Sequence, residues 1–442
     1  MTNRARTWLS QWGPILPLLI AEATVWAGFG ALLPILPIYF TQHGVSLPML
    51  GIVVAAWPAA RLIGEPIFGR IADSAPRRTM MVIGLLAASV FAVAPLFVVD
   101  LGVVALILTR VGAGLAAAMY DPAARGYLAD ASPPERQGET FGLYGAAQMG
   151  GLMLGPAIGG IAAGLTGNPT TPFWMASIFV FAAGVLVLIR VPELPHPPRT
   201  SAQADTADAR PGTAPGPEAG GSEPVGRPTR LRNRLLVAAI VIGVGSYFAG
   251  GSYEVVWSLY LTSLGAGLGM IGLTFFTFAL PILLLSPVMG RYIDHEGGFL
   301  ALVLGMAVVA ISGALYGLVP NVWFVILFGL VEGTAFALAS PAQFLLVARA
   351  SPAGRSSTAQ GIFGAAGTIG TIAASLSAGF LAEIDLRLPF LVTGVVTGIS
   401  LLLGLAIGGR RLYDALQPSH LDATPATASP SSASATTGQA KG

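Results

Sequence analysis

The sequence predicts an all-α membrane protein whose twelve transmembrane helices form two pseudo-symmetric bundles of six. Composition, twelve long apolar segments and an internal repeat indicate this fold. Of 442 residues, 54% are hydrophobic, only 10% are charged, and 57 are glycine. A soluble core cannot bury that much apolar surface, whereas a lipid bilayer can.

Twelve apolar segments are long enough to cross a bilayer about 30 Å thick at about 1.5 Å per residue. They cover residues 14–40, 48–69, 79–99, 103–129, 138–165, 172–190, 235–262, 269–290, 298–319, 321–348, 356–382 and 388–408. Because hydrocarbon offers no water to open backbone groups, we expect each segment to be an α-helix. The first segment exceeds the apolar core of a signal peptide, and we expect it to be retained.

An internal repeat relates the two halves of the chain. With an offset of 219 residues, a set around the fourth and fifth segments falls on identical residues: Ala131, Ser132, Pro133, Arg136, Gly142 and Gly145 on Ala350, Ser351, Pro352, Arg355, Gly361 and Gly364. With an offset of 221, earlier residues match: Tyr39, Thr41, Gly44 and Gly51 on Tyr260, Thr262, Gly265 and Gly272. Two six-helix repeats are the simplest explanation.

Residues 191–234 lose the apolar pattern and become rich in Pro, Ala, Gly, Ser and Thr, as in flexible linkers. We therefore expect an N-terminal bundle over 1–190, a cytoplasmic linker over 191–234, a C-terminal bundle over 235–409 and a disordered tail over 410–442. If the N-terminus is cytoplasmic, eighteen arginines lie on the inner side and only Arg387 lies outside. The distribution of basic residues thus predicts that both termini are cytoplasmic.

Three short motifs occur in the N-terminal half: one after the second apolar segment, one in the fourth and one in the fifth. The loop after the second segment reads Gly69-Arg-Ile-Ala-Asp73-Ser-Ala-Pro-Arg77-Arg78, and the fourth segment contains Arg110 and Gly114. The fifth segment carries a glycine motif made of Gly142, Gly151, Gly155, Pro156, Gly159 and Gly160. Together these motifs resemble those of the major facilitator superfamily, and the glycine motif resembles that of its twelve-span drug:proton antiporters.

The resemblance implies export by alternating access, with helices 1, 4, 7 and 10 lining a central cavity. It also implies a conformational latch in which Asp73 faces the start of helix 11. The members expected in this latch are Gly69, Asp73, Arg77, Arg78 and Asp130. Independently of the family, the four-residue spacing of the glycines in helix 5 favours close helix packing. Packing alone and a role in blocking leakage both remain possible.

Charged residues inside the apolar segments are the sharpest functional signal, because each costs at least about 2.5 to 3.5 kcal/mol at the bilayer centre. The candidates for substrate binding and proton coupling are Glu22, Arg110, Asp121, Glu254 and Glu332. A purely structural pairing of Glu22 with Arg110 is the alternative. For Arg61 with Glu65 we expect neutralisation within one helical turn, whereas for Asp121 such pairing with Arg125 and a functional role both stay open.

These observations predict a secondary transporter, namely a proton-coupled exporter of small amphipathic or cationic compounds. Alternatives are an exporter of sugars or other metabolites and a non-transporting membrane sensor. We expect no enzymatic activity, cofactor or metal: cysteine is absent, and the four histidines are scattered. The expected partners are a small molecule, protons and membrane lipids; a net charge of +2 does not favour nucleic acid. We expect a monomer in a bacterial inner membrane.

Overall fold

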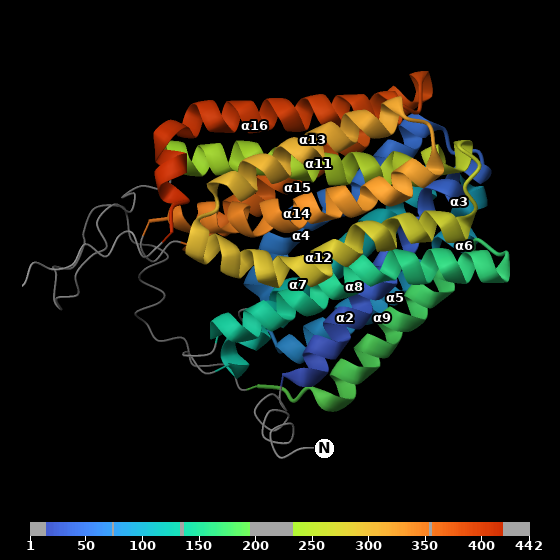
Figure 1. Ribbon diagram of the computed structural model, residues 1–442. Helices are drawn as coiled ribbons and strands as arrows, with labels where there is room; N and C mark the ends of the chain where they lie inside the picture. The colour runs from blue at the N-terminus through green and yellow to red at the C-terminus, as the bar shows by residue number, and fades with distance from the viewer. Residues whose placement is uncertain (1–14, 73–74, 133–136, 195–232, 353–355, 419–442) are drawn as a thin grey trace, which may run out of the picture.

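The computed structural model describes residues 15–72, 75–132, 137–194, 233–352 and 356–418 (Figure 1). Within these ranges all regular secondary structure is helical, as the sequence predicts. Most of the predicted linker and tail lies outside them. The tail boundary differs in detail, because the last helix bends at Gly409, with φ +52° and ψ −140°, and then continues to Ala415.

The N-terminal half contains α2 (Leu16–Leu32), α3 (Leu36–Gln42), α4 (Leu47–Ala72), α5 (Arg77–Val93), α6 (Pro95–Val98), the 3₁₀ turn η1 (Val99–Leu101), α7 (Val103–Ala131), α8 (Gln137–Thr166) and α9 (Thr171–Arg190). The C-terminal half contains α11 (Arg234–Ser263), α12 (Leu268–Glu296), α13 (Phe299–Leu318), α14 (Val322–Arg349), α15 (Ser356–Ile384) and α16 (Leu388–Ala415). The described chain has eleven helices long and apolar enough to span a membrane, or twelve if α5 to η1, bent by 43°, is one span. The predicted twelve-helix fold is confirmed.

Prolines explain the two interruptions that the sequence analysis did not place. Pro34 lies between α2 and α3, and Pro95 begins α6 directly after α5 ends. Proline lacks the backbone N–H that a helix interior requires, so the hydrogen-bond ladder breaks at each position. The first and third spans are therefore bent helices.

The repeat is visible in the turns as well as in the sequence. Gly44, after α3, has φ +82°, and its equivalent Gly265, after α11, has φ +85°. Non-glycine residues rarely adopt this left-handed conformation. Each half thus closes its first hairpin with the same glycine turn.

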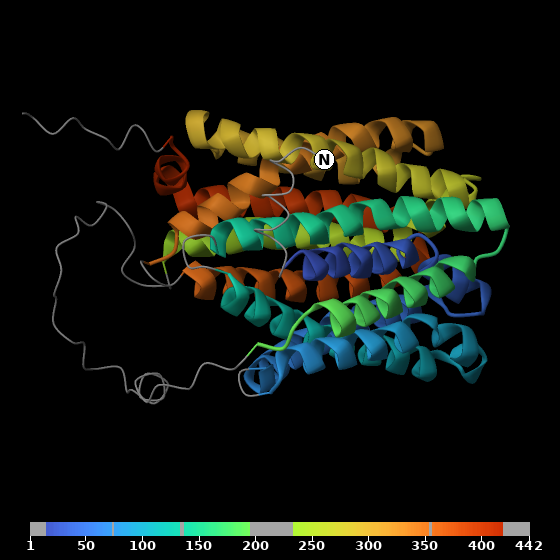
Figure 2. The same ribbon diagram turned by 90° about the horizontal axis from the view of Figure 1, so that it is seen from below.

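The hydrophobic core shows how the halves meet. Helices α2 and α11 begin, and α9 and α16 end, at one end of the molecule, which we call the terminal end (Figures 1 and 2). One large buried cluster lies toward the opposite end and takes residues from both halves, such as Leu50 and Trp257. Toward the terminal end, each half has a separate cluster. The hydrophobic core is therefore shared by the two halves at the opposite end and divided between them at the terminal end.

Glycines make the closest approaches between the halves. A Cβ on Gly160 of α8 would lie 2.6 Å from the Cα of Gly272 on α12, and a Cβ on Gly51 of α4 would lie 3.2 Å from the Cα of Gly379 on α15. The repeat relates these two contacts, because Gly51 is equivalent to Gly272 and Gly160 to Gly379. Side chains of any size would separate these helices.

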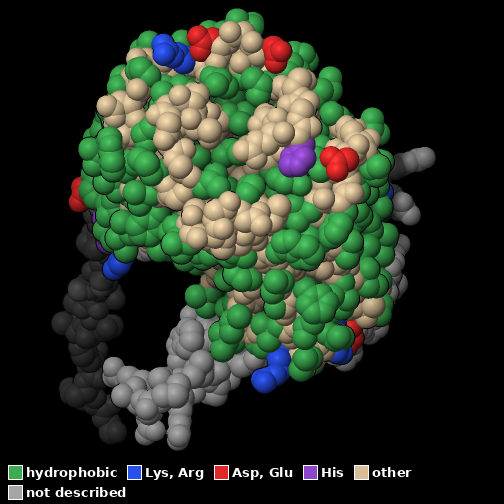
Figure 3. All heavy atoms as spheres, turned by 90° about the vertical axis from the view of Figure 1, so that its right-hand side faces the viewer, with side chains coloured by type: hydrophobic (Ala, Val, Ile, Leu, Met, Phe, Trp, Pro, Cys, Tyr) green, Lys and Arg blue, Asp and Glu red, His purple; other side chains and the backbone are tan. Residues whose placement is uncertain are grey.

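Toward the terminal end, the same two helices face open space. Among the described residues, and apart from the backbone of the glycine's own helix, no atom lies within 4 Å of a Cβ built on Gly142 or Gly145 of α8, or on Gly361 or Gly364 of α15. Figure 3 shows the opposite end, with hydrophobic side chains covering the flanks of the bundle. The gap between the halves thus opens at the terminal end.

Candidate functional site

The glycine motif of α8 packs against two different helices. Cβ atoms on Gly151, Gly155 and Gly159 would collide with the backbone of α2; for Gly155 the nearest atom is the Ala27 carbonyl oxygen, at 2.5 Å. Gly160 instead faces α12 of the other half. One helix therefore joins its own bundle on one face and meets the second bundle on another.

Two other members of the motif differ in their surroundings. Pro156 contacts the same stretch of α2, its Cδ lying 2.9 Å from a Cβ built on Gly30. Gly142 differs, because no described residue of another helix lies within 4 Å of a Cβ built on it.

The predicted latch is centred on Arg77 in the described part of the chain. Its guanidinium forms an ion pair with Asp130 and donates to the carbonyl oxygen of Gly126, both on α7. Arg78 donates to the Leu188 carbonyl oxygen at the end of α9. These contacts connect the beginning of α5 with the ends of α7 and α9.

The structure shows no close contact between helices at Gly69 and does not describe Asp73, the other two residues of the predicted latch. Gly69 has only a distant neighbour, since the atom nearest to a Cβ placed on it would be Pro122 Cβ, at 3.8 Å. Asp73 lies outside the described residues.

Glu22 is fully buried on α2 and accepts three hydrogen bonds. The donors are Tyr120 Oη at 2.6 Å, Trp26 Nε1 at 2.9 Å and Gln148 Nε2 at 3.1 Å. Among the described residues, no basic side chain forms an ion pair with it. The proposed pairing of Glu22 with Arg110 does not form, because Arg110 has a different acidic partner.

That partner is Glu254, on α11 of the other half. The Nη2 atom of Arg110 lies 3.3 Å from its Oε1. The Arg110 Nε is buried and has no hydrogen-bond partner among the described residues. The sequence alone did not show which acidic residue pairs with Arg110. The tertiary structure does, because it brings the Arg110 side chain of α7 to Glu254 on α11.

A second group of charges lies between α4 and α7. Arg61 bonds Glu65 at 2.6 Å and also pairs with Asp121. Arg125 lies 3.7 Å from Asp121 and 4.0 Å from Glu65. The neutralisation within one helical turn expected from the sequence is present, and Asp121 additionally links the two helices.

Glu332 of α14 is 3% exposed and is held by tyrosines alone among the described residues. Tyr316 Oη donates at 2.8 Å and Tyr253 Oη at 3.3 Å. The ring of Trp257 lies edge-on to Tyr316, with centroids 4.9 Å apart. Glu332 thus lies in an aromatic environment beside the core shared by the two halves.

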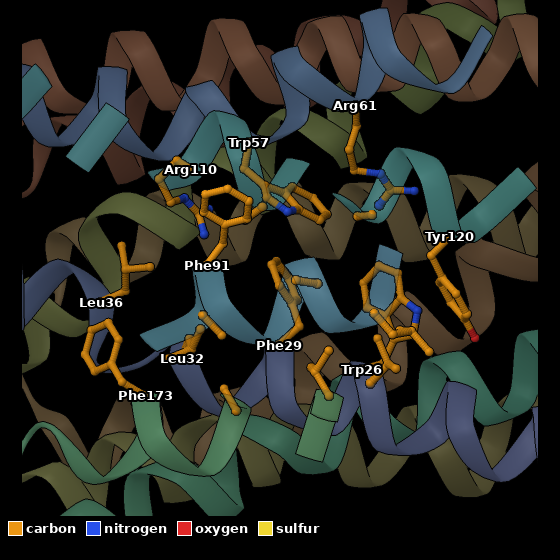
Figure 4. Close-up of a pocket in the computed structure, with 18 of the residues that line it drawn as sticks. Trp26, Phe29, Leu32, Leu36, Trp57, Arg61, Phe91, Arg110, Tyr120 and Phe173 are labelled. Atoms are coloured by element: carbon orange, nitrogen blue, oxygen red, sulfur yellow. The ribbon is translucent and has the colours of Figure 1, made fainter. Parts of the chain in front are cut away.

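A cavity of about 790 Å³, its open mouth included, lies within the N-terminal half (Figure 4). All of its lining residues come from that half, whereas the resemblance implied a cavity between the halves. Arg110, Trp57, Arg61, Phe29 and Trp26 all line this cavity. A much smaller pocket adjoins Arg110 and Glu254 at the boundary between the halves.

The aromatic lining is the part that sequence reasoning missed. Trp57 stacks on Phe29 with centroids 4.6 Å apart, and the Arg61 guanidinium carbon lies 4.8 Å from the Trp57 centroid. A usable signal was present, since Trp26 follows Glu22 by one helical turn and Trp57 precedes Arg61 by one. Such spacing also occurs in ordinary cores, so it did not single these residues out.

The chemistry of the site is limited to carboxylates, guanidinium groups, hydroxyls and aromatic surfaces. In the described ranges, no group of three His, Asp or Glu side chains could hold a metal ion. The arrangement suits non-covalent binding and proton transfer at buried acids.

Comparison with known proteins agrees with this architecture. NorA of Staphylococcus aureus, a quinolone resistance protein, is 28% identical over 236 residues, which cover 53% of this chain and 55% of NorA. Multidrug resistance protein 1 of Bacillus subtilis is 31% identical over 166 residues, covering 38% and 42% of the two chains. The chain thus spans about half the length, or less, of the curated relatives it matches.

Solved structures share the fold at low sequence identity. A bacterial homologue of the human lysosomal transporter Spinster, inward-facing and unoccupied, superposes with a TM-score of 0.69 at 14% identity, over 95% of this chain and all of that one. A D-xylose–proton symporter gives 0.66 at 18% identity, over 89% and 97%. The profile of the Major Facilitator Superfamily matches residues 18–253 and again residues 236–435. The chain is an integral membrane protein that belongs to the Major Facilitator Superfamily of transporters.

Proposed function

We propose that the protein is a proton-coupled exporter of small amphipathic compounds, cations among them, in a bacterial inner membrane with both termini cytoplasmic. The relatives named for quinolone and multidrug resistance support this substrate range. The arginine distribution along the sequence supports the orientation. In that orientation the gap at the terminal end opens to the cytoplasm.

The observation that carries the proposal is a pair of buried carboxylates in different halves. Glu22 and Glu332 each accept hydrogen bonds from tyrosine hydroxyls, and neither forms an ion pair with a described basic residue. A carboxylate without a counter-ion in a dry site is neutralised most cheaply by a proton or by a cationic ligand. Competition between the two at one acid couples proton entry to substrate exit.

Alternating access follows from the same geometry. In this conformation the halves separate at the terminal end and are sealed at the opposite end by the glycine contacts and the shared core. Rocking the halves about the central acids would open the other end without unfolding either bundle. The acids would then exchange protons with the other compartment.

The test is efflux of ethidium, a cationic dye, from proteoliposomes across an imposed pH gradient. Glu22→Gln and Glu332→Gln keep the side-chain volume and remove the titratable group, and Glu383→Gln, exposed near the end of α15, is the matched control. We expect uphill dye movement by the native protein and Glu383→Gln, and its loss in one or both buried variants. If dye flux by the native protein is unchanged after the pH gradient is collapsed, proton coupling is refuted. Flux inhibited by sugars and not by lipophilic cations would indicate a sugar exporter instead.

A further inference from the structure

The cavity in the N-terminal half contains a cationic group whose hydrogen-bonding capacity is incompletely used. Arg110 is 5% exposed, and its Nε is buried without a partner among the described residues. Its one ion-pair contact, to Glu254, is long at 3.3 Å. Buried donors in folded proteins are nearly always paired, so an unpaired guanidinium nitrogen beside a cavity indicates a site for an acceptor from outside the protein.

The other arginine of the cavity is already satisfied. Arg61 donates to Glu65 through both Nε and Nη2, at 3.0 and 2.6 Å, and pairs with Asp121. A ligand anion would therefore form more new hydrogen bonds at Arg110 than at Arg61, and bind more tightly there. A guanidinium group binds a carboxylate through two parallel hydrogen bonds, which suits the Nε and Nη atoms of Arg110.

The walls around Arg110 favour a flat, aromatic body. Phe29 and Trp57 are stacked, and the Arg110 guanidinium carbon lies 6.0 Å from the Trp57 centroid. Figure 4 shows the Arg110 side chain directed into the cavity, which Phe91 also lines. Aromatic faces bind planar rings over a large area, and several aromatic side chains line this cavity.

We propose that this cavity binds planar aromatic carboxylates, with the ligand carboxylate on Arg110 in competition with Glu254. The proposal extends the substrate range of the exporter proposed above to anionic and zwitterionic aromatic compounds, and it rests on that function for its role in transport. Arg110 and Glu254 belong to different halves and both line the smaller pocket between them. A bound carboxylate would thus replace a contact that joins the two bundles.

Equilibrium dialysis of the purified full-length protein in detergent, without any gradient, tests the proposal. The probes are naphthoate, its neutral analogue naphthamide, and naphthylmethylammonium, which share one ring system. We expect naphthoate to bind roughly tenfold to a hundredfold more tightly than naphthamide, as for hydrogen bonds to a charged group. Equal binding of the two, or strongest binding of the ammonium probe, would overturn the proposal.

Two variants of opposite expected sign locate the site. Glu254→Gln removes the internal competitor and should tighten naphthoate binding about tenfold while leaving naphthamide unchanged. Arg110→Gln should abolish the preference for naphthoate. Trp323→Leu, a change of an exposed tryptophan on α14, is the control for aromatic loss elsewhere, and Trp57→Leu should weaken all three probes.

The outcome separates this proposal from the transport function. If Glu254→Gln weakens naphthoate binding, or if the preference survives Arg110→Gln, the Arg110 site is wrong even where dye efflux works. If the binding results hold and no flux occurs in proteoliposomes, the cavity assignment stands and the transport proposal fails.

Discussion

The two halves of the molecule share a backbone frame and differ in the chemistry of their interiors. In the N-terminal half, Arg61 and Asp121 belong to a network of charges beside an aromatic cavity. In the C-terminal half, Glu332 is surrounded by tyrosines and other aromatic rings, and no described basic side chain pairs with it. The repeat preserves glycine turns and helix contacts, whereas Arg110 is equivalent to Gly329 and Glu332 to Ala113.

This difference separates residues that serve the fold from residues that give each half its own interior chemistry. Positions where backbones approach closely recur in both halves, because both bundles need the same helix crossings. The buried charges Arg110 and Glu332 do not recur, so the two halves contribute different chemistry to the molecule's interior. Substitutions at a packing position or at a buried charge of one half therefore test whether that position serves the fold or the chemistry of the interior.

The largest effect is expected where α8 contacts α2 inside the N-terminal half. Gly155→Leu would force a side chain into the Ala27 carbonyl, and the equivalent position in α15 is Ala374, so only the C-terminal half accepts a methyl group here. We expect a loss of about 3 kcal/mol or more in stability, since two backbones must separate. Thermal unfolding in detergent measures it, with Gly142→Leu, which faces open space, as the control. Equal effects of the two variants would contradict this packing.

A smaller, conformational effect is expected at the contact between the halves. Gly160→Leu should weaken the seal against Gly272 without disturbing either bundle. Because the native chain has no cysteine, Ala378→Cys, in the shared core, provides a single reporter. We expect its labelling by a water-soluble maleimide to become about tenfold faster, consistent with about 1 to 2 kcal/mol of overpacking. Unchanged labelling, with Gly145→Leu as control, would show that this glycine does not seal the opposite end.

The buried acids give the next contrast. Tyr316→Phe removes the shorter of two hydrogen bonds to Glu332, whereas Tyr120→Phe leaves Glu22 with Trp26 and Gln148. With the carboxylates ionised, we expect Tyr316→Phe to cost about 1.5 to 3 kcal/mol of stability, and Tyr120→Phe less. Thermal unfolding at one fixed pH compares them. The reverse order would mean that the remaining donors to Glu22 are weaker than their distances indicate.

The overall fold could be predicted from the sequence because the apolar segments are long and the two halves repeat the same pattern. Apolar segments of about twenty or more residues identify helices, and Gly51 with Gly272 shows the duplication. Bends at Pro34 and Pro95 were not predicted, although proline explains both.

The site could be predicted only in part. Glu22, Arg110 and Glu332 stand out because charge is rare in apolar helices, and the structure buries all three. Which charges pair depends on the angle and rotation of neighbouring helices, so the Arg110–Glu254 contact was not foreseen. The Trp57–Phe29 cavity wall likewise joins α4 to α2 through tertiary packing, which local spacing does not encode.

The smallest effect is expected at the latch, which again distinguishes the halves. Arg77 pairs with the partly exposed Asp130, whereas at the corresponding end of the C-terminal half Arg349 donates to the carbonyl oxygens of Ala415 and Gln417, at 2.7 and 2.6 Å. Exposed ion pairs contribute about 0.2 to 1 kcal/mol, so a double-mutant cycle of Arg77→Ala and Asp130→Ala should give a coupling energy in that range. Arg349→Ala should cost more, because it leaves two carbonyl groups without their donor. A coupling energy above about 2 kcal/mol would instead make the Arg77–Asp130 pair a strong clamp on the terminal end of the N-terminal bundle.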